Sequence, residues 1–364
     1  MPSHLIPGRK APAFDPARLS SVLIIKMSSI GDVVHAMPVA SALRGTYPNL
    51  RITWLVEDWL APLLQRHHAV DRLITLPALR LPLTGPALLR LRQAIRELRA
   101  ESYDAAIDLH GLLKSSIVSV LSRAPVRIGT DFQREGAHFF SYGVPSYSPT
   151  TNVVEEYLFS AKFLGAKTDQ VVFDLKPDGA GLLSVREMLA QRAVPAKLPL
   201  VVINPSASVP WKDWAAQRWV AVAQALSDDG RVIVTGIRRH RDRNAAIARA
   251  AGALDLTGET SLSQLIALLS IASLHLAPDT GSAHIAAALG TPVIGIYGPT
   301  VASRSAPYGQ VDRTLWGGER CTSSCPRRCP NQLACLDSIS ADEVVAKART
   351  IFRERALWSA PNGP

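Results

Sequence analysis

The 364-residue sequence contains no apolar run of the roughly 18 residues that a membrane-spanning helix needs. Its first twenty residues hold four prolines and no apolar stretch of the kind found in secretory signal peptides. We therefore predict a cytoplasmic protein that does not span a membrane, with residues 1–20 forming a flexible N-terminal extension.

Cysteine is scarce, and its four copies fall within fifteen residues, at Cys321, Cys325, Cys329 and Cys335. A secreted protein of this size usually has its disulfides spread along the chain, so the cluster needs another explanation. One interpretation is a structural zinc or iron–sulfur site, although zinc ligands are more often arranged as two closely spaced pairs separated by a longer loop. The other interpretation is a set of reduced thiols or a redox-labile pair.

Acidic residues are outnumbered by basic ones, 30 against 40, which gives a net charge of +10. This excess favours an anionic partner such as nucleic acid, phospholipid headgroups or a phosphorylated substrate. Nucleic acid is not expected, because the aromatic-rich strand motifs of RNA-binding domains are missing and the arginines do not line one stripe. A hydrophobic content of 47% excludes a wholly disordered chain.

Both halves of the sequence alternate short apolar strands with helical segments. The expected strands are 21–26, 52–56 and 105–109 in the first half, and 200–203, 232–235, 274–276 and 293–297 in the second. Continuously apolar strands are typical of parallel sheets covered on both faces, so we predict two doubly wound α/β domains. Glycines and prolines between residues 165 and 198 indicate the linker. We place the domains at 21–180 and 181–350, the latter ending in a helix that packs back on the first domain, and a tail at 351–364.

A helix expected over residues 86–100 combines a leucine stripe with four arginines, Arg90, Arg92, Arg96 and Arg99. One interpretation is an ordinary surface helix whose apolar side packs on a sheet. The other is a basic face that approaches anionic lipid.

The first polar motif runs from Lys26 to Asp32, directly after the first expected strand. Ligands of open α/β sheets bind at the carboxyl ends of strands, so this loop is expected to face the cleft between the domains. Gly31 allows a tight turn, and Asp32 stands at the start of the next helix. Asp32 is either a simple N-cap or a carboxylate that takes a proton from an acceptor hydroxyl. The helix N-terminus would keep it ionised at neutral pH.

The second motif, residues 204–214, follows the first strand of the second half. Its hydroxyl groups and Lys212 can hold a phosphate just beyond the strand end, with the lysine acting as a point charge. The alternative is that Lys212 is an ordinary solvated lysine.

The third motif, residues 277–284, is a turn between a short strand and a helix. The backbone N–H groups of Thr280, Gly281 and Ser282 form a ready anion site at the helix N-terminus, and His284 can reach the same anion one turn along. Alternatively, Asp279 only caps the helix and His284 is a half-buried histidine with its hydrogen bonds satisfied inside the protein.

These motifs, placed at strand ends and divided between two domains, resemble those of the bacterial heptosyltransferases of glycosyltransferase family 9. The resemblance covers roughly residues 21–350. Its most specific parts are KMSSIGDVVH (26–35), DLHGLLKS (108–115), KDWAAQRW (212–219), DTGSAH (279–284) and YGPT (297–300). It implies the GT-B fold, in which two Rossmann-like domains face each other across a cleft.

The resemblance also implies roles on the acceptor side. By position, Asp32 matches the catalytic base, and Ser29 and Gly31 belong to the same loop. Lys26 and Arg134 match basic positions near the acceptor.

On the donor side, the resemblance places Lys212 on the phosphates, with Ser208 as a preceding hydroxyl contact. Asp279 matches a carboxylate bonded to the sugar hydroxyls. Thr280, Gly281 and His284 match the turn that binds the pyrophosphate. Asp242, in a basic run after Gly236, is the residue that could serve where the family often has an acidic contact to the ribose.

Taken together, the resemblance implies an inverting transferase that moves heptose from ADP-heptose to a Kdo- or heptose-bearing lipid acceptor of the lipopolysaccharide inner core. It implies no metal, since cationic side chains and helix N-termini would offset the charge of the leaving diphosphate. We expect a monomer that works in the cytoplasm or at the inner face of the inner membrane. The alternatives are another nucleotide-sugar, a glycan or protein acceptor, or a nucleotide-sugar-binding protein without turnover.

Overall fold

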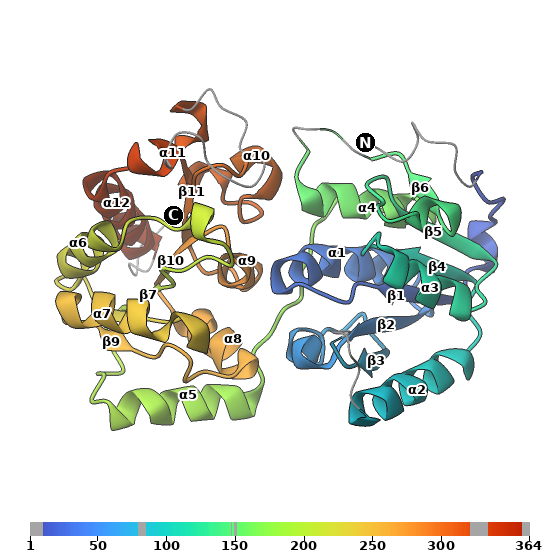
Figure 1. Cartoon of the computed structure of the whole chain (residues 1–364), viewed down its shortest axis with the longest axis horizontal. Helices are drawn as coiled ribbons and strands as arrows, with labels where there is room; N and C mark the ends of the chain where they lie inside the picture. The colour runs from blue at the N-terminus through green and yellow to red at the C-terminus, as the bar shows by residue number, and fades with distance from the viewer. Residues whose placement is uncertain (1–9, 79–84, 147, 149–150, 321–333, 359–364) are drawn as a thin grey trace. The chain divides into compact units, whose positions relative to one another are not determined.

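The computed structural model describes residues 10–78, 85–146, 148, 151–320 and 334–358. The chain divides into two compact units, of which the first ends at Leu175 and the second begins at Lys176. Each unit is built around a parallel sheet of six strands with helices packed on it (Figure 1). The predicted doubly wound α/β architecture is therefore confirmed, and each expected strand is found within two residues of its expected ends.

In the first unit, strands and helices alternate along the chain. They are β1 (Ser21–Ile25), α1 (Ile30–Thr46), β2 (Arg51–Glu57), β3 (Arg72–Leu76), α2 (Gly85–Arg99), β4 (Ala105–Asp108), α3 (Leu113–Leu121), β5 (Val126–Thr130), β6 (Tyr142–Val144) and α4 (Val153–Phe163). Short 3₁₀ turns occur at η2 (Pro16–Arg18), η3 (Asp58–Leu63) and η4 (Ala137–Phe139). The strand order is β3-β2-β1-β4-β5-β6, with all neighbours parallel.

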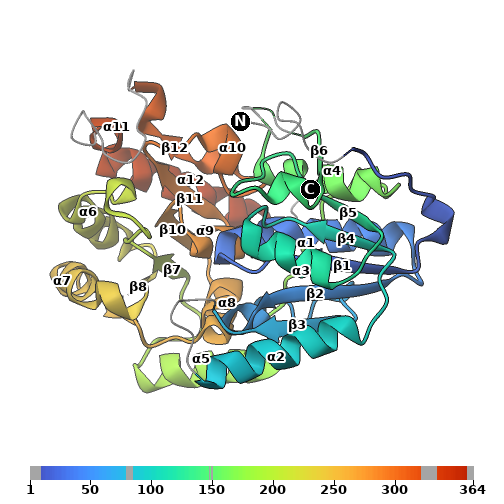
Figure 2. The same ribbon diagram turned by 45° about the vertical axis from the view of Figure 1, so that its right-hand side comes forward.

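The core of the first unit lies between the sheet and helices α2 and α3. Ala94 and Leu98 of α2 pack there against alternate residues of the central strands, such as Leu23 and Ile25. Right-handed crossovers place α1 on the opposite face, where it packs against α4 (Figure 2). Strand β1 is buried along its whole length because both faces of the sheet are covered.

The second unit repeats this plan. Its elements are α5 (Gly179–Gln191), β7 (Leu200–Ile203), η5 (Pro210–Lys212), α6 (Ala216–Leu226), β8 (Arg231–Val234), η6 (Arg238–His240), α7 (Arg241–Ala251), β9 (Leu254–Asp255), α8 (Leu262–Ile271), β10 (Leu274–Pro278), α9 (Gly281–Ala288), β11 (Val293–Tyr297), α10 (Ala302–Ser305), η7 (Val311–Arg313), β12 (Leu315–Trp316), η8 (Gly317–Arg320), α11 (Ala334–Asp337) and α12 (Ala341–Trp358). The strand order is β12-β11-β10-β7-β8-β9, again parallel.

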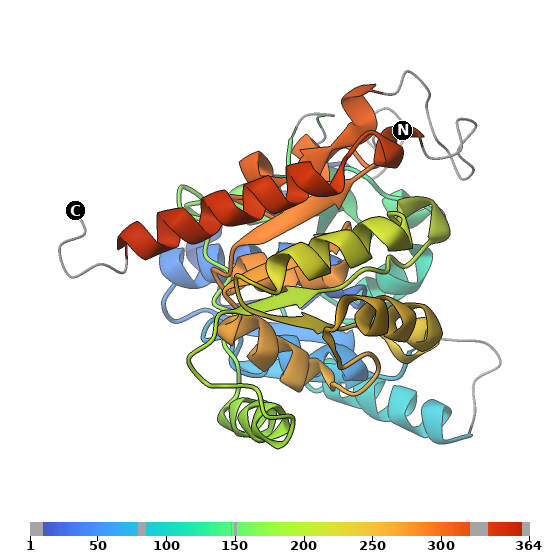
Figure 3. The ribbon, with the colours of Figure 1, turned by 90° about the vertical axis from the view of Figure 1, so that its left-hand side faces the viewer.

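The core of the second unit lies under α6, α7 and α12. Trp214 and Trp219 meet there edge to face, with ring centroids 5.1 Å apart. Figure 3 shows α12, in red, running along this face beside α6. Val344 and Ile351 of α12 are buried in the same core, so the final helix is part of the second unit's own packing.

Both sheets reverse their strand order at one place, between β1 and β4 in the first and between β7 and β10 in the second. Open α/β sheets usually bind their ligands at such a reversal point, beyond the carboxyl ends of the strands. The three polar motifs follow β1, β7 and β10, and each therefore lies at such a reversal point.

Three expected boundaries are corrected. The boundary after residue 180 falls inside α5. Asp178 caps this helix by accepting a hydrogen bond from Gly181 N–H at 2.5 Å, so Gly179 and Gly181 belong to the start of a helix and not to a linker. The tail expected from residue 351 is helical to Trp358. The extension expected over 1–20 is anchored at its end, where Ser20 donates two hydrogen bonds to Asp104, each 2.8 Å long.

Within the described part of the chain, no helix is both long enough and apolar enough to cross a membrane.

Candidate active site

The loop after β1 presents a carboxylate at the reversal point of the first sheet. Ser29 is the N-cap of α1, and Asp32 occupies the third helical position. The Asp32 carboxylate accepts hydrogen bonds from Ser29 N–H at 3.1 Å and from the Ser29 hydroxyl at 3.0 Å. The interpretation of Asp32 as the N-cap is therefore wrong: Ser29 caps the helix, and Asp32 closes the first turn from inside it. Gly31, between them, is buried.

Lys26 supplies a buried cation next to this carboxylate. Its ammonium donates hydrogen bonds to the carbonyl of Leu109 at 2.8 Å and to the hydroxyl of Tyr157 at 2.7 Å. It lies 3.9 Å from Asp32 Oδ1, whose side chain is 44% exposed while that of Lys26 is 5% exposed. One partner of the pair is thus fixed inside the protein and the other is open to solvent.

This pairing sets the charge state of both groups. Burial lowers the pKa of Lys26, although the neighbouring carboxylates of Asp32 and Asp108 oppose that effect. The crowding of protein atoms opposes ionisation of Asp32, but the attraction of Lys26 and the Ser29 hydrogen bonds outweigh it, so its pKa lies below the usual value. Asp32 is consequently a carboxylate, ready to accept a proton, at neutral pH.

A second loop, after β4, lies beside the first. Asp108 pairs with Ile25 across the sheet and is fully buried. Its carboxylate accepts backbone hydrogen bonds from His110 and Gly111, each 3.0 Å long, and further ones from Ser115 and Ser116. Burial nevertheless raises the pKa of Asp108. Asp108 therefore shapes the loop that carries His110.

His110 is a site residue that the sequence assignments missed. Burial, together with the charges of Lys26 and Lys114, lowers the pKa of His110 to about 3, while Asp32 acts in the opposite direction. His110 is therefore a neutral imidazole in the electrostatic neighbourhood of Asp32. The signal was available, because His110 lies within the DLHGLLKS segment.

Arg134 is tied to the same loop through its backbone. Its N–H donates to the carbonyl of Gly111 at 2.9 Å, and its exposed guanidinium lies 5.8 Å from the centre of the Phe132 ring. The charge of Arg134 also contributes to lowering the pKa of Lys26. The structure thus gathers the expected acceptor-side residues, Lys26, Ser29, Asp32 and Arg134, at one edge of the first sheet.

The second unit gathers a cationic group at its own reversal point. The ammonium of Lys212, in η5, donates a hydrogen bond to Asp279, which directly follows β10. His284 Nε2 approaches the other oxygen of Asp279 at 3.7 Å. Burial opposes ionisation of Asp279, but the hydrogen bond from His284 and the attraction of Lys212 hold its pKa well below the usual value.

A hydrogen-bond chain orients the first turn of α9. His275 donates from Nδ1 to the carbonyl of Val202 at 2.9 Å, which leaves Nε2 as an acceptor for the Ser282 hydroxyl at 3.1 Å. Ser282 in turn accepts from Thr280, the N-cap of α9, at 3.0 Å. Burial lowers the pKa of His275 to about 4, so this arrangement is neutral. It fixes the N-terminus of α9 with the N–H groups of Gly281 and Ser282 at its positive end.

The loop that carries Lys212 is held from α7. Arg243 donates to the carbonyl of Trp214 at 2.8 Å and to the Ser206 hydroxyl at 2.9 Å, and Ser206 donates to Asn244 at 2.7 Å. Asp242 itself is exposed in the first turn of α7.

Ser208 is exposed, and its carbonyl accepts a hydrogen bond from Arg239 at 3.0 Å. The basic run after Gly236 thus supports the loop that carries Lys212.

The cysteine cluster is described only in part. Cys321, Cys325 and Cys329 lie outside the described residues, and Cys335 is buried in the core of the second unit. A metal site at this cluster therefore remains a prediction.

Each unit thus offers one kind of chemistry. The first presents an ionised, solvent-accessible carboxylate that can take a proton from a hydroxyl. The second presents a lysine, a histidine and a helix N-terminus, which together suit a phosphate or diphosphate.

Comparison with known proteins fits this division. The model of glycosyltransferase family 9 (heptosyltransferase) matches residues 91–334, more than half of the chain. The lipopolysaccharide core heptosyltransferase OpsX of Haemophilus influenzae is 27% identical over 304 residues, covering 81% of this chain and 84% of that protein. Lipopolysaccharide heptosyltransferase 1 of Escherichia coli K12 is 29% identical over 299 residues, covering 79% of this chain and 91% of that protein.

Solved structures show the same fold. The E. coli heptosyltransferase WaaC with ADP matches with a TM-score of 0.70 and 23% identity, covering 91% of this chain and 99% of that chain. WaaC with ADP-2-deoxy-2-fluoro heptose matches with a TM-score of 0.67 and 24% identity, covering 92% and 99%. The GT-B class, with two Rossmann-like units, is thereby confirmed. The chain belongs to glycosyltransferase family 9, the heptosyltransferases, and is a glycosyltransferase.

Proposed function

We propose that this protein transfers heptose from ADP-heptose to a Kdo- or heptose-bearing acceptor of the lipopolysaccharide inner core, with inversion at the anomeric carbon and without a metal ion. Family membership supports heptosyl transfer. The relatives named as lipopolysaccharide heptosyltransferases support the acceptor class, and the WaaC structures with ADP and an ADP-heptose analogue support the donor.

The observation that carries the mechanism is the state of Asp32. Its carboxylate is held ionised by Lys26 and Ser29 and is exposed at the reversal point of the first sheet. In the proposed reaction, Asp32 takes the proton of the acceptor hydroxyl while that oxygen attacks the anomeric carbon and the bond to ADP breaks. A single displacement of this kind inverts the anomeric centre.

The donor would bind in the second unit. Lys212, His284 and the N-terminus of α9 would hold the diphosphate and offset the charge that develops as ADP leaves. Asp279 would accept hydrogen bonds from the heptose hydroxyls. Ser208 and Asp242 are exposed and would contact the phosphates and the ribose.

A lipid-bearing acceptor fits the surface of the first unit. Leu113, Ile117 and Val120 of α3 are 40% to 48% exposed and recur at helical spacing, so they form one apolar stripe. Helix α2 packs against α3 and carries the exposed Arg90, Arg92, Arg96 and Arg99. We propose that this apolar and basic surface rests on the anionic inner face of the inner membrane, where the acceptor would be presented. We also propose that the protein acts as a monomer.

The test is a calorimetric and thermal-shift titration of the full chain against ADP, UDP, GDP and ADP-heptose. Ligands that bind only the folded state raise its melting temperature by an amount that grows with the logarithm of ligand concentration over Kd, so selective stabilisation by ADP and ADP-heptose supports the donor assignment. Selective stabilisation by UDP or GDP would show that the donor carries that nucleotide and not ADP. A lack of response to every nucleotide would contradict the proposed donor site.

A further inference from the structure

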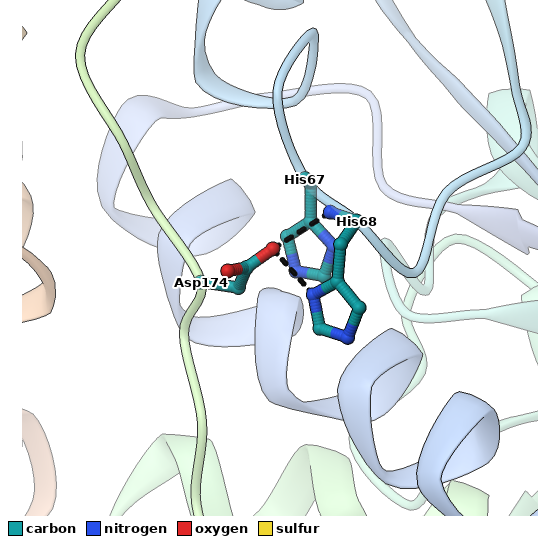
Figure 4. A group of neighbouring side chains, drawn as sticks. All are labelled: His67, His68 and Asp174. Carbon is teal, nitrogen blue, oxygen red and sulfur yellow. Dashed lines mark hydrogen bonds and ion pairs between the residues drawn. The ribbon is translucent and has the colours of Figure 1, made fainter.

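We propose that His67, His68 and Asp174 form a binding site for a divalent transition-metal ion such as Zn²⁺, separate from the candidate active site. One possible ligand atom from each side chain lies within 4.8 Å of the others. Figure 4 shows both imidazole rings beside the carboxylate of Asp174. Two imidazoles and a carboxylate are a common set of protein ligands for zinc, with a fourth position left for water.

The local backbone places both histidines on one side of the chain. They follow η3 in a turn that is closed by a hydrogen bond from Val70 N–H to the carbonyl of His67 at 3.1 Å. The two rings are parallel within 1°, with centroids 5.9 Å apart. Adjacent residues of an extended strand would instead point to opposite faces. The turn therefore presents two imidazoles to the same point.

The carboxylate comes from a distant segment. Asp174 follows α4 and accepts hydrogen bonds from the backbone N–H of His68 at 2.6 Å and from His68 Nδ1 at 2.5 Å. Its side chain is 8% exposed, whereas that of His68 is 54% exposed and that of His67 is buried. Two ligands are thus fixed in the protein, and the third stands where an ion can enter from solvent.

Metal binding requires the three ligand atoms, which lie within 4.8 Å of one another, to reach tetrahedral spacing. Zinc bonds of about 2.0–2.2 Å place the ligand atoms of a tetrahedral site about 3.3 Å apart. The His68 ring lies 2.5 Å from Asp174 and is exposed, so rotation about its own side-chain bonds can lengthen this distance to the tetrahedral spacing. His67 Nδ1 accepts a hydrogen bond from Ala69 N–H that is long, at 3.3 Å. A change of tautomer in the His67 ring would therefore lose only a weak hydrogen bond.

The position of the site indicates a structural role. The turn with both histidines precedes β3, so it lies at the amino edge of the sheet, whereas Lys26 and Asp32 follow β1 at the carboxyl edge. Asp174 stands directly before Leu175, the last residue of the first unit. A bound ion would fasten the end of the first unit to the turn between η3 and β3.

The test is zinc titration of the full chain, prepared without a polyhistidine tag and stripped with a chelator. Wild type is compared with His68→Gln and Asp174→Asn, and the matched controls are His138→Gln and Asp169→Asn. Calorimetry gives the stoichiometry and affinity, and the melting temperature of each metal-free protein reports its folding. Any ion held by the cysteine cluster is common to all five proteins. Copper(II) in place of zinc adds an electron paramagnetic resonance spectrum in which coordinated imidazole nitrogens are visible.

The proposal predicts that wild type and both controls bind one zinc ion more than the two site variants, or bind it at least about tenfold more tightly. It also predicts that the imidazole signal of bound copper decreases in His68→Gln and not in His138→Gln. Equal stoichiometry and affinity in all five proteins would overturn the proposal and leave His68 and Asp174 as a simple ion pair.

Discussion

Lys26 Nζ lies 3.9 Å from Asp32 Oδ1, and this pair joins a buried cation to an exposed carboxylate. Removing a buried charge from such a pair changes the pKa of its partner, because an opposite charge at this range favours the ionised form. The pair therefore links the interior of the first unit to the protonation of the group proposed as the catalytic base.

Lys26→Met should move the acidic limb of the activity profile to higher pH. The proposed base, Asp32, would act in its ionised form, so activity should be lost as pH falls through its pKa, and loss of the Lys26 charge should raise that pKa by about one unit or more. The measurement is kcat/KM against pH. The exposed Lys162 provides the control Lys162→Met, which should leave the limb in place. An unchanged limb in Lys26→Met would show that Lys26 does not set the charge of Asp32.

Lys212→Ala should weaken ADP binding and turnover together, each by about 10- to 100-fold. A hydrogen bond to a charged group contributes about 1.5–3 kcal/mol, and Lys212 is proposed to contact the diphosphate in both the bound and reacting states. Calorimetry with ADP and steady-state kinetics check this, with the exposed Lys197→Ala as the control. ADP affinity equal to that of wild type would remove Lys212 from the donor site.

Asp279→Asn should destabilise the protein at pH 7, and by a smaller amount at pH 3. The pKa of Asp279 is depressed in the folded state, so its charged form contributes stability above the unfolded pKa of about 3.9 and loses it as pH falls toward the folded value. We expect a difference in unfolding free energy on the order of 2 kcal/mol at pH 7. Urea unfolding at several pH values measures it, and the exposed Asp228→Asn serves as the control. A difference that stays constant down to pH 3 would argue against the depressed pKa.

His110→Gln should lower the rate without changing the shape of its pH dependence. Because burial and neighbouring lysines lower the pKa of His110 to about 3, this imidazole stays neutral through the working range and adds no limb near pH 6 to 7. Loss of one polar group beside Asp32 should reduce kcat roughly tenfold. The check is kcat/KM against pH for both proteins. A wild-type limb near pH 6.5 that disappears in the variant would make His110 a titrating catalyst instead.

The inner strands of both units, apart from β5, could be predicted from sequence because each is a largely apolar run. The edge strands β3, β6, β9 and β12 were missed because they are only partly buried, and β5 was missed because Arg127 and Gly129 interrupt its apolar run. Asp108 and His110 were missed as site residues for a different reason. They become neighbours of the Asp32 loop only through the parallel register that sets Asp108 beside Ile25, and register is not visible along one segment.

The donor side shows a similar limit. In residues 241–244 (RDRN), the rotation of the helix about its own axis decides which side chains face inward, and packing against the rest of the unit sets that rotation. The structure buries Asn244 and directs Arg243 to the loop that carries Lys212, while Asp242 is exposed. Glycine favours turns, so Gly179 and Gly181 predict a linker, whereas the cap supplied by Asp178 begins a helix there.

Heptose transfer by wild type and Asp32→Asn, measured beside ADP-heptose binding to both proteins, tests the central claim most directly. Asparagine keeps the shape of the side chain but cannot accept the proton, so kcat should fall by about 10² to 10⁴. ADP-heptose affinity should stay within about twofold of wild type, because the proposed donor contacts belong to the second unit. Turnover of Asp32→Asn close to that of wild type, on a Kdo-bearing acceptor, would contradict the assignment of Asp32 as the base.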